Sequence, residues 1–128
     1  RISEDPEVEI ARVVLLGLSS PEGAFEFNKR LYQIPYRDIV YMESRRRVIH
    51  LFGRNGEEYR FYKKMKDLLE EISHTGNMFI RVHCSYVVNY YYIKSLSSTE
   101  TELLTGEKLP VSGEYKNEAL KKFMGMME

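Results

Sequence analysis

Apolar residues occupy both alternating sets of positions between residues 79 and 93, and a single polar step interrupts them. That step is His83-Cys84-Ser85. A strand with apolar residues on both faces is typically buried on both sides, so the pattern predicts two buried strands joined by a short polar link. Loops held by a rigid β scaffold often carry recognition, and we expect this link to contact a partner.

Alternation of apolar and polar residues predicts further strands in the middle and the last third of the chain. We expect a meander over 39–42, 48–52 and 58–61, with its first strand inside an extended segment that starts at Tyr36 and ends at Glu43. Asn55-Gly56, between the second and third of these, is a strong hairpin signal. Other predicted strands, one pair turning at Thr105-Gly106, lie at 25–32, 94–97, 102–104 and 108–111.

Helical signals are short and few. Met65, Leu68 and Ile72 share one face of a predicted helix over 63–72, and Gly76-Asn77 ends it. A second helix should run from 114 or 115 to 124. Asp5 and Pro6 are typical of a helix start near the N-terminus. We therefore expect a linker or helical extension over 1–24, a mainly β domain with short helices over 25–124, and a tail over 125–128.

Length and composition fit one folded domain. The chain has 128 residues with ten tyrosines and no tryptophan, which favours β structure. Its longest early apolar run, 13–18, is far shorter than the roughly 20 residues of a membrane span. Cys84 is the single cysteine, which excludes an internal disulfide and fits a cytoplasmic protein. Because the chain begins at Arg1, we interpret it as the C-terminal piece of a longer protein.

The charges are balanced overall but unevenly distributed. Residues 27–66 contain eleven basic and four acidic side chains, a net charge of +7, whereas 1–26 carry −4 and 67–128 carry −3. A net charge of zero argues against nucleic acid, but a basic block in the middle favours an anionic partner. The alternative is that these side chains are ordinary solvated faces of strands.

Four blocks, in this order and at this spacing, resemble the LytTR DNA-binding domain over residues 25–124. They are 34–44 (IPYRDIVYMES), the Leu-Leu-Glu-Glu-Ile helix end at 68–72, 79–89 (FIRVHCSYVVN), and 109–112 (LPVS) followed by Tyr115. The resemblance implies an elongated, mainly β output domain of a bacterial response regulator. Such domains bind direct-repeat DNA as dimers, through loops that reach successive major grooves. A receiver or sensor domain would precede the chain.

The resemblance places DNA contacts on three loops. Guanidinium groups fork two donors and suit the O6 and N7 acceptors of guanine, so arginines in the first loop are expected to read bases. Lysines near the start of the 63–72 helix, together with an arginine before the second loop, would contact phosphate. The expected DNA-binding residues are Arg45, Arg46 and Arg47; His83, Cys84 and Ser85; Ser112, Gly113, Glu114 and Lys116; and, for phosphate, Lys63, Lys64, Lys66 and Arg81.

The chain departs from the family pattern at two of these loops. Family members commonly place Arg or Asn directly after the histidine and Arg after Val-Ser, where this chain has Cys84 and Gly113. Glu114 adds an acid that would repel phosphate or accept from a cytosine amino group. We therefore expect either a binding-site sequence that differs from that of an Arg-bearing relative, or an affinity that depends more strongly on residues 45–47. A second hypothesis follows from the same departures and from the net charge of zero: a protein-interaction or dimerisation module with weak or no DNA binding.

His83 has two readings, as a base-reading residue or as a hydrogen-bonded part of the scaffold. Neither it nor the other two histidines shows metal-ligand spacing, and no cofactor is expected. Catalysis is not expected either, because His83 and Cys84, as neighbours on a strand, would point to opposite faces. An exposed thiol beside His83 and Arg81 would be sensitive to oxidation, which would then weaken DNA binding.

Overall fold

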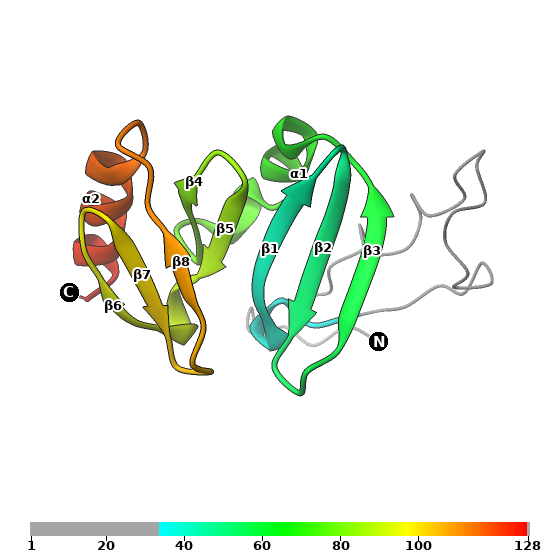
Figure 1. Cartoon of the computed structure of the whole chain (residues 1–128), viewed down its shortest axis with the longest axis horizontal. Helices are drawn as coiled ribbons and strands as arrows, with labels where there is room; N and C mark the ends of the chain where they lie inside the picture. The colour runs from blue at the N-terminus through cyan, green and yellow to red at the C-terminus, as the bar shows by residue number, and fades with distance from the viewer. Residues whose placement is uncertain (1–33, 128) are drawn as a thin grey trace.

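Strands dominate the computed structural model, which describes residues 34–127 apart from the side chain of His74 (Figure 1). They form two antiparallel sheets, one in the order β3-β2-β1-β5-β4 and the other β6-β7-β8. The mainly β fold predicted from the sequence is confirmed. The strand expected at 25–32, the N-terminal helix and the boundary at residue 25 lie outside the described residues. The strands are β1 (Ile39–Arg45), β2 (Val48–Gly53), β3 (Glu58–Tyr62), β4 (Phe79–His83), β5 (Tyr86–Asn89), β6 (Ile93–Leu96), β7 (Glu100–Leu103) and β8 (Lys108–Pro110).

The first three strands form the predicted meander, and β5 then pairs with its first strand. β1 is antiparallel to β2 on one side and to β5 on the other, where Tyr41 lies opposite Val88. The Asn55-Gly56 turn closes the β2–β3 hairpin, and Gly56 has a φ of 89°, a conformation that favours glycine. Pairing of β1 with β5 places residues more than forty positions apart in sequence side by side.

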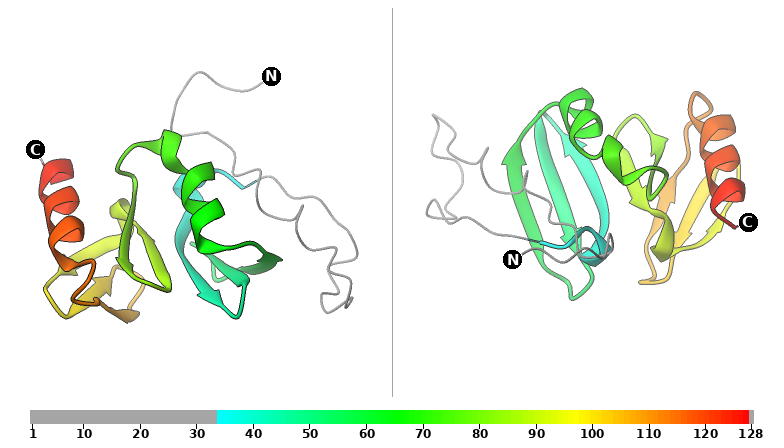
Figure 2. Two further views of the ribbon diagram at one scale, coloured as in Figure 1. Left: turned by 90° about the horizontal axis from the view of Figure 1, so that it is seen from above. Right: turned by 180° about the vertical axis from the view of Figure 1, so that it is seen from behind.

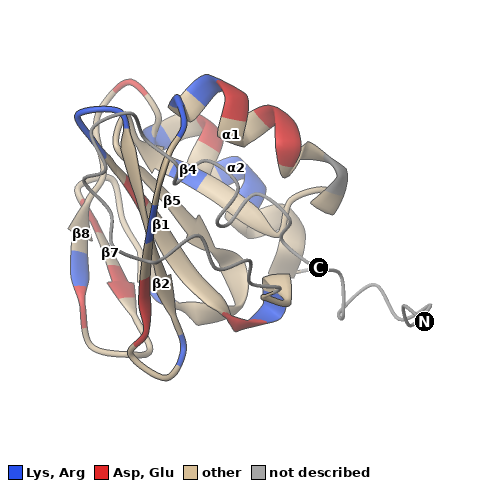
Figure 3. Cartoon of the chain, turned by 90° about the vertical axis from the view of Figure 1, so that its right-hand side faces the viewer, with Lys and Arg blue, Asp and Glu red and all other residues tan. Residues whose placement is uncertain are grey.

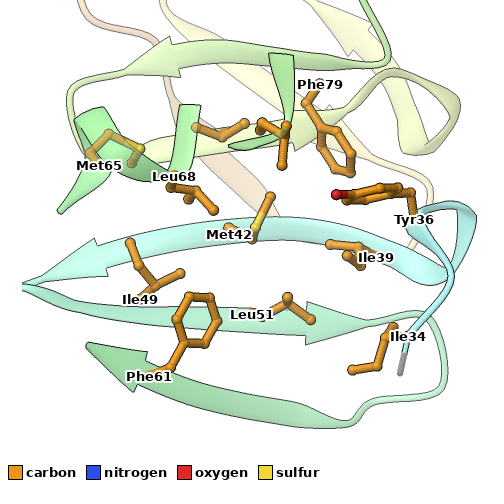
Figure 4. Packing of buried hydrophobic residues seen from close by; sticks show 12 residues of the cluster. Ile34, Tyr36, Ile39, Met42, Ile49, Leu51, Phe61, Met65, Leu68 and Phe79 are labelled. Atoms are coloured by element: carbon orange, nitrogen blue, oxygen red, sulfur yellow. The ribbon is translucent and has the colours of Figure 1, made fainter. Parts of the chain in front are cut away.

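Two hydrophobic clusters lie on opposite faces of the β4–β5 pair. The helix α1 (Met65–Glu71) covers one face of the larger sheet, and its Leu68 packs in a cluster with Met42, Ile49, Leu51 and Phe61 (Figures 2 and 4). The second cluster joins the other face to the smaller sheet and to the helix α2 (Lys116–Met127), which contributes Ala119.

The β4–β5 hairpin confirms the reading of residues 79–93 as buried strands with a polar link. Val87 belongs to the first cluster and Val88 to the second, so consecutive side chains are buried on opposite faces. Cys84 and Ser85 form the turn, and Cys84 is exposed. Burial on both sides therefore fixes the hairpin and presents its tip to solvent.

Two segments predicted as sheet are short 3-10 helices instead. Tyr36–Asp38 form η3, because Pro35 starts a turn in which the Asp38 amide donates to the Pro35 carbonyl at 2.9 Å. Tyr90–Tyr92 form η5, in which Tyr90 and Tyr92 pack against buried hydrophobic residues whereas Tyr91 is 59% exposed. A third short 3-10 helix, η4 (Ser73–Thr75), follows α1.

The ends of both helices differ from the prediction. α1 begins at Met65, so Lys63 and Lys64 precede it instead of forming its first turn. α2 begins at Lys116 and continues to Met127, into the segment expected to be a tail. Within residues 34–127, no helix has the length and apolar content needed to cross a membrane.

Asn89 explains why β5 ends where η5 begins. Its side chain is fully buried, and its Nδ2 donates to the Ile39 carbonyl at 2.8 Å and, at 3.4 Å, to the Tyr36 carbonyl. Its Oδ1 accepts from the Tyr91 amide at 2.9 Å. One amide side chain thus satisfies backbone groups of η5, η3 and the start of β1, as the sequence analysis expected of a turn asparagine.

Candidate nucleic-acid interface

Three connections lie at the same end of the molecule: the β1–β2 turn, the β4–β5 turn and the β8–α2 loop (Figure 1). Two backbone hydrogen bonds link them. The Ser44 amide donates to the Ser85 carbonyl at 2.9 Å, and the Ser112 amide donates to the Val82 carbonyl at 3.0 Å. The structure therefore brings together the three loops that the sequence analysis placed far apart in the chain.

The tip of the β1–β2 turn consists of Arg46 and Arg47. Both have positive φ, 50° and 70°, as the two central residues of a type I′ hairpin turn require. Glycine and asparagine adopt this conformation readily, whereas a longer side chain is strained in it. Both arginines are exposed, and no hydrogen bond or ion pair with another described residue holds their side chains. They are two adjacent, available guanidinium groups.

Arg45, the third arginine of the run, is held by the scaffold. It is the last residue of β1, and its Nη2 donates to Glu43 Oε1 at 2.9 Å, which raises the pKa of Arg45. Tyr86 donates its hydroxyl to the other oxygen of the same carboxylate, at 3.2 Å. The three arginines are thus not equivalent, because the charge of Arg45 is partly compensated.

His83 has a defined role in the β4–β5 turn. Its Nδ1 accepts a hydrogen bond from the Ser85 amide at 3.0 Å, and its ring meets the edge of Tyr86 at 5.4 Å between centroids. With Nδ1 as an acceptor, the neutral ring carries its proton on Nε2. The scaffold role left open by the sequence is therefore present in the structure, and Nε2 is left as a donor.

Cys84 lies closer to His83 than the sequence analysis expected. Its Sγ is 3.6 Å from His83 Nδ1, and the prediction that the two side chains point to opposite faces is wrong. The reason is that Cys84 belongs to the turn and not to β4. The Nδ1 lone pair already accepts from the Ser85 amide, so it is not a free base for the thiol. Among residues 34–127, no three His, Cys, Asp or Glu side chains gather as a metal site.

The β8–α2 loop exposes Gly113 and Glu114 but not the hydroxyl of Ser112. Ser112 Oγ is buried and has no hydrogen-bond partner among the described residues. The Ser112 carbonyl accepts from the Tyr115 amide at 3.0 Å. Ser112 is among the DNA-binding residues expected from the sequence, but a contact through its buried hydroxyl does not fit this geometry. Ser112 shapes the loop, while Lys116 begins α2 directly behind it.

The lysines before and in α1 lie beside the arginine tip. The Lys63 amide donates to the Arg47 carbonyl at 3.1 Å, which fixes this approach to the helix. Its Nζ, however, forms an ion pair with Glu71 at 2.8 Å, so its charge is partly compensated. Lys64 and Lys66 are exposed, without an ion pair to any residue in 34–127. In the ribbon of Figure 3, basic residues (blue) lie near the start of α1 and acidic residues (red) further along it.

An acid–base cluster lies on β2 and β3. His50 is buried, and its Nδ1 lies 2.7 Å from Glu58 Oε2, the same oxygen that accepts from Arg60 Nε at 3.1 Å. These two hydrogen bonds, the one with His50 first, lower the pKa of Glu58. None of the sequence motifs pointed to this cluster, although His50 and Arg60 occupy paired positions in the register.

We expect Glu58→Gln to remove part of the stability at neutral pH but little of it in acid. A carboxyl whose folded pKa is lowered stabilises the fold above its unfolded pKa of about 4.3, and that contribution is lost as the pH falls through the folded value. The effect should stay below about 1 kcal/mol because Glu58 is partly exposed. Thermal unfolding of both proteins between pH 3 and 7 tests it. A melting-temperature difference that is constant over this range would contradict it.

Comparisons with known proteins agree with one another. The family model described as the LytTr DNA-binding domain matches residues 29–124. Among solved structures, the chain is similar to the LytTr DNA-binding domain of a response regulator from Bacillus cereus, with a TM-score of 0.59 and 24% identity. The match covers 78% of this chain and 93% of that one, and at this identity it concerns the fold. A search of curated protein sequences found no significant match.

Proposed function

Because the chain belongs to the LytTr DNA-binding domain family, we propose that it binds double-stranded DNA through the three loops at one end of the fold. The observation that supports this most is the pair Arg46 and Arg47, which are exposed and uncompensated at the tip of a two-residue turn. A hairpin tip is narrow enough to enter the major groove, about 12 Å wide. Strained arginines at such a tip are typical of a functional site.

In this proposal the loops have different tasks. Arg46 and Arg47 read guanine through O6 and N7, and His83 offers its Nε2 hydrogen to a base or a phosphate oxygen. Lys64 and Lys66 contact phosphate and position the domain without reading sequence. Lys116, next to the third loop, contacts phosphate beside that loop.

The biological context is also a proposal. The B. cereus relative is a domain of a response regulator, and we place this chain in the same role, as the output module of a transcription regulator. Binding to direct repeats as a dimer would let two sets of loops enter successive grooves on one face of the duplex. A receiver or sensor domain would supply the input.

A second candidate function rests on the β8–α2 loop and the β4–β5 turn. Cys84, Gly113 and Glu114 are exposed at positions where basic or amide side chains are common in the family. A surface that has lost these contacts would suit a protein partner better than DNA. The two functions differ in one measurable property, since phosphate contacts release counterions and make the affinity depend on salt.

Salt-dependent binding to a labelled duplex tests the proposed function. We expect the affinity for a repeat obtained by selection from random DNA to fall with rising salt. Lys64→Ala should weaken binding to selected and shuffled duplexes equally, and lower the slope of log K against log salt by roughly 0.9. Lys108→Ala, an exposed lysine at the opposite end of the fold, is the matched control and should change neither. Binding that is absent, or insensitive to salt, would reject the proposal in favour of the interaction module.

A further inference from the structure

Arg81 of β4, which the sequence analysis expected to contact phosphate, is half-buried and held by contacts with other residues of the protein. Its Nη2 donates to the Cys84 carbonyl at 2.9 Å and its Nε to the His83 carbonyl at 3.3 Å. The centre of its guanidinium lies 4.5 Å from the centroid of the Tyr115 ring. The edge of the guanidinium group therefore contacts the β4–β5 turn, and its face contacts Tyr115 at the end of the β8–α2 loop.

These contacts use the properties that distinguish arginine from lysine. A guanidinium is planar, so it can direct two donors to neighbouring carbonyls while it stacks on an aromatic ring. The two carbonyls belong to the end of β4 and the turn, where β5 pairs only from Tyr86 onward. A lysine ammonium at this position keeps the charge but lacks the planar group that holds two donors in a rigid fork while it stacks on the ring.

The third loop is joined to this unit at two points. The Tyr115 amide donates to the Ser112 carbonyl, and the Ser112 amide donates to the Val82 carbonyl, at 3.0 Å each. Tyr115 thus closes the loop that exposes Gly113 and Glu114, while its ring rests on Arg81. Among the described residues, Arg81 alone has a side chain that contacts both of these loops through hydrogen bonds or ring stacking.

We propose that Arg81 is a positioning residue that holds the β4–β5 turn and the β8–α2 loop in one fixed arrangement, and that it does not bind phosphate. Its effect on DNA rests on the proposed function, whereas the coupling itself is a property of the free protein. Without these contacts of Arg81, both loops would have to become ordered during binding, and that entropic cost would lower the affinity for DNA.

Two substitutions separate positioning from phosphate binding. We expect Arg81→Lys and Arg81→Met to weaken binding to the selected duplex alike, by roughly tenfold, because the fixed arrangement is lost in both. The slope of log K against log salt should stay at the wild-type value in both. A phosphate contact predicts the opposite: Arg81→Lys close to wild type, and Arg81→Met with a slope lower by roughly 0.9.

The free protein provides a second, independent measurement. Arg81→Met should shift the amide resonances of Gly113 and Glu114, although these residues lie in another loop, and should leave those around Gly56 at the opposite end unchanged. Tyr115→Leu should reproduce the loss of DNA affinity, and adding Arg81→Lys to it should cause little further loss. Equal thermal stability of the variants confirms that they are folded.

Three results would each overturn the positioning role. They are unchanged amide resonances of Gly113 and Glu114 in Arg81→Met, additive losses of DNA affinity in the double variant, and wild-type DNA affinity in Arg81→Lys. Failure of the wild-type protein to bind DNA would reject the proposed function alone, because the amide shifts test the coupling without DNA.

Discussion

Replacing the tip of the β1–β2 turn, with Arg46→Asn and Arg47→Gly together, will strongly weaken specific DNA binding and at the same time stabilise the domain. Both residues have positive φ, and Asn-Gly is the pair that a type I′ turn favours most. The left-handed conformation costs an ordinary residue about 1 kcal/mol, so relief at two positions should raise the melting temperature by several degrees. Each lost guanine contact should cost about 1–3 kcal/mol, so affinity should fall by roughly 100-fold.

Two controls accompany this variant. Arg46→Lys with Arg47→Lys keeps the charge and the strained turn but removes the forked donors, so it should retain binding to shuffled duplexes and lose preference for the selected one. Arg54→Ala removes an exposed arginine at the opposite end and should bind as wild type does. Calorimetry and fluorescence anisotropy measure the two properties. Loss of stability in the Asn-Gly variant, or undiminished binding, would contradict the idea that strain is retained at this turn for function.

Asn89→Asp is expected to have the largest effect on stability. The Asn89 side chain is fully buried and donates to the Ile39 carbonyl. A carboxylate there would place an acceptor against an acceptor and bury a charge without a partner. We expect a loss of at least about 3 kcal/mol at neutral pH, a large fraction of the stability of a domain of this size.

The pH dependence of this loss has a definite sign. Burial and the missing donor raise the folded pKa of the introduced carboxyl above its unfolded value of about 3.9, so the variant is least destabilised in acid and loses stability as the pH rises. Asn77→Asp makes the same chemical change at an exposed position and should be nearly neutral throughout. Denaturant unfolding at pH 4 and pH 7 tests both. A loss for Asn89→Asp that is equal at the two pH values would show that burial of the charge is not the cause.

The buried sheet supports the loops at its end. Asn89 ties β5 to the beginning of β1, and the neighbouring strands β1 and β4 carry two of the three loops. Buried side chains are concentrated in the sheet, whereas the exposed turn of Arg46 and Arg47 has the positive φ angles of a strained backbone. Conformational strain at a recognition loop is tolerated because the rest of the structure holds it in place.

Local patterns were sufficient to predict most of the elements. Side chains on a strand alternate between two faces, so the run 79–93 and the Asn55-Gly56 turn predicted buried strands and a hairpin. They failed at 36–38 and 90–92, where a proline turn and the buried Asn89 side chain form 3-10 helices from residues with β propensity. The order of the four family blocks along the chain also indicated the three loops.

The partners of the individual side chains depend on the folded chain. The pairing of β1 with β5 gathers the loops at one end, and it joins segments more than forty residues apart. Only after that assembly does Tyr86 donate to Glu43, Arg81 stack on Tyr115, and the Ser112 hydroxyl become buried. Residue types and spacing show which side chains could bind DNA. The contacts of the folded chain decide which of their charges are already used: Glu43 compensates Arg45 along the same strand, whereas Arg81 is engaged by a loop remote in sequence. Arg46 and Arg47 remain as the uncompensated pair at the loop tip.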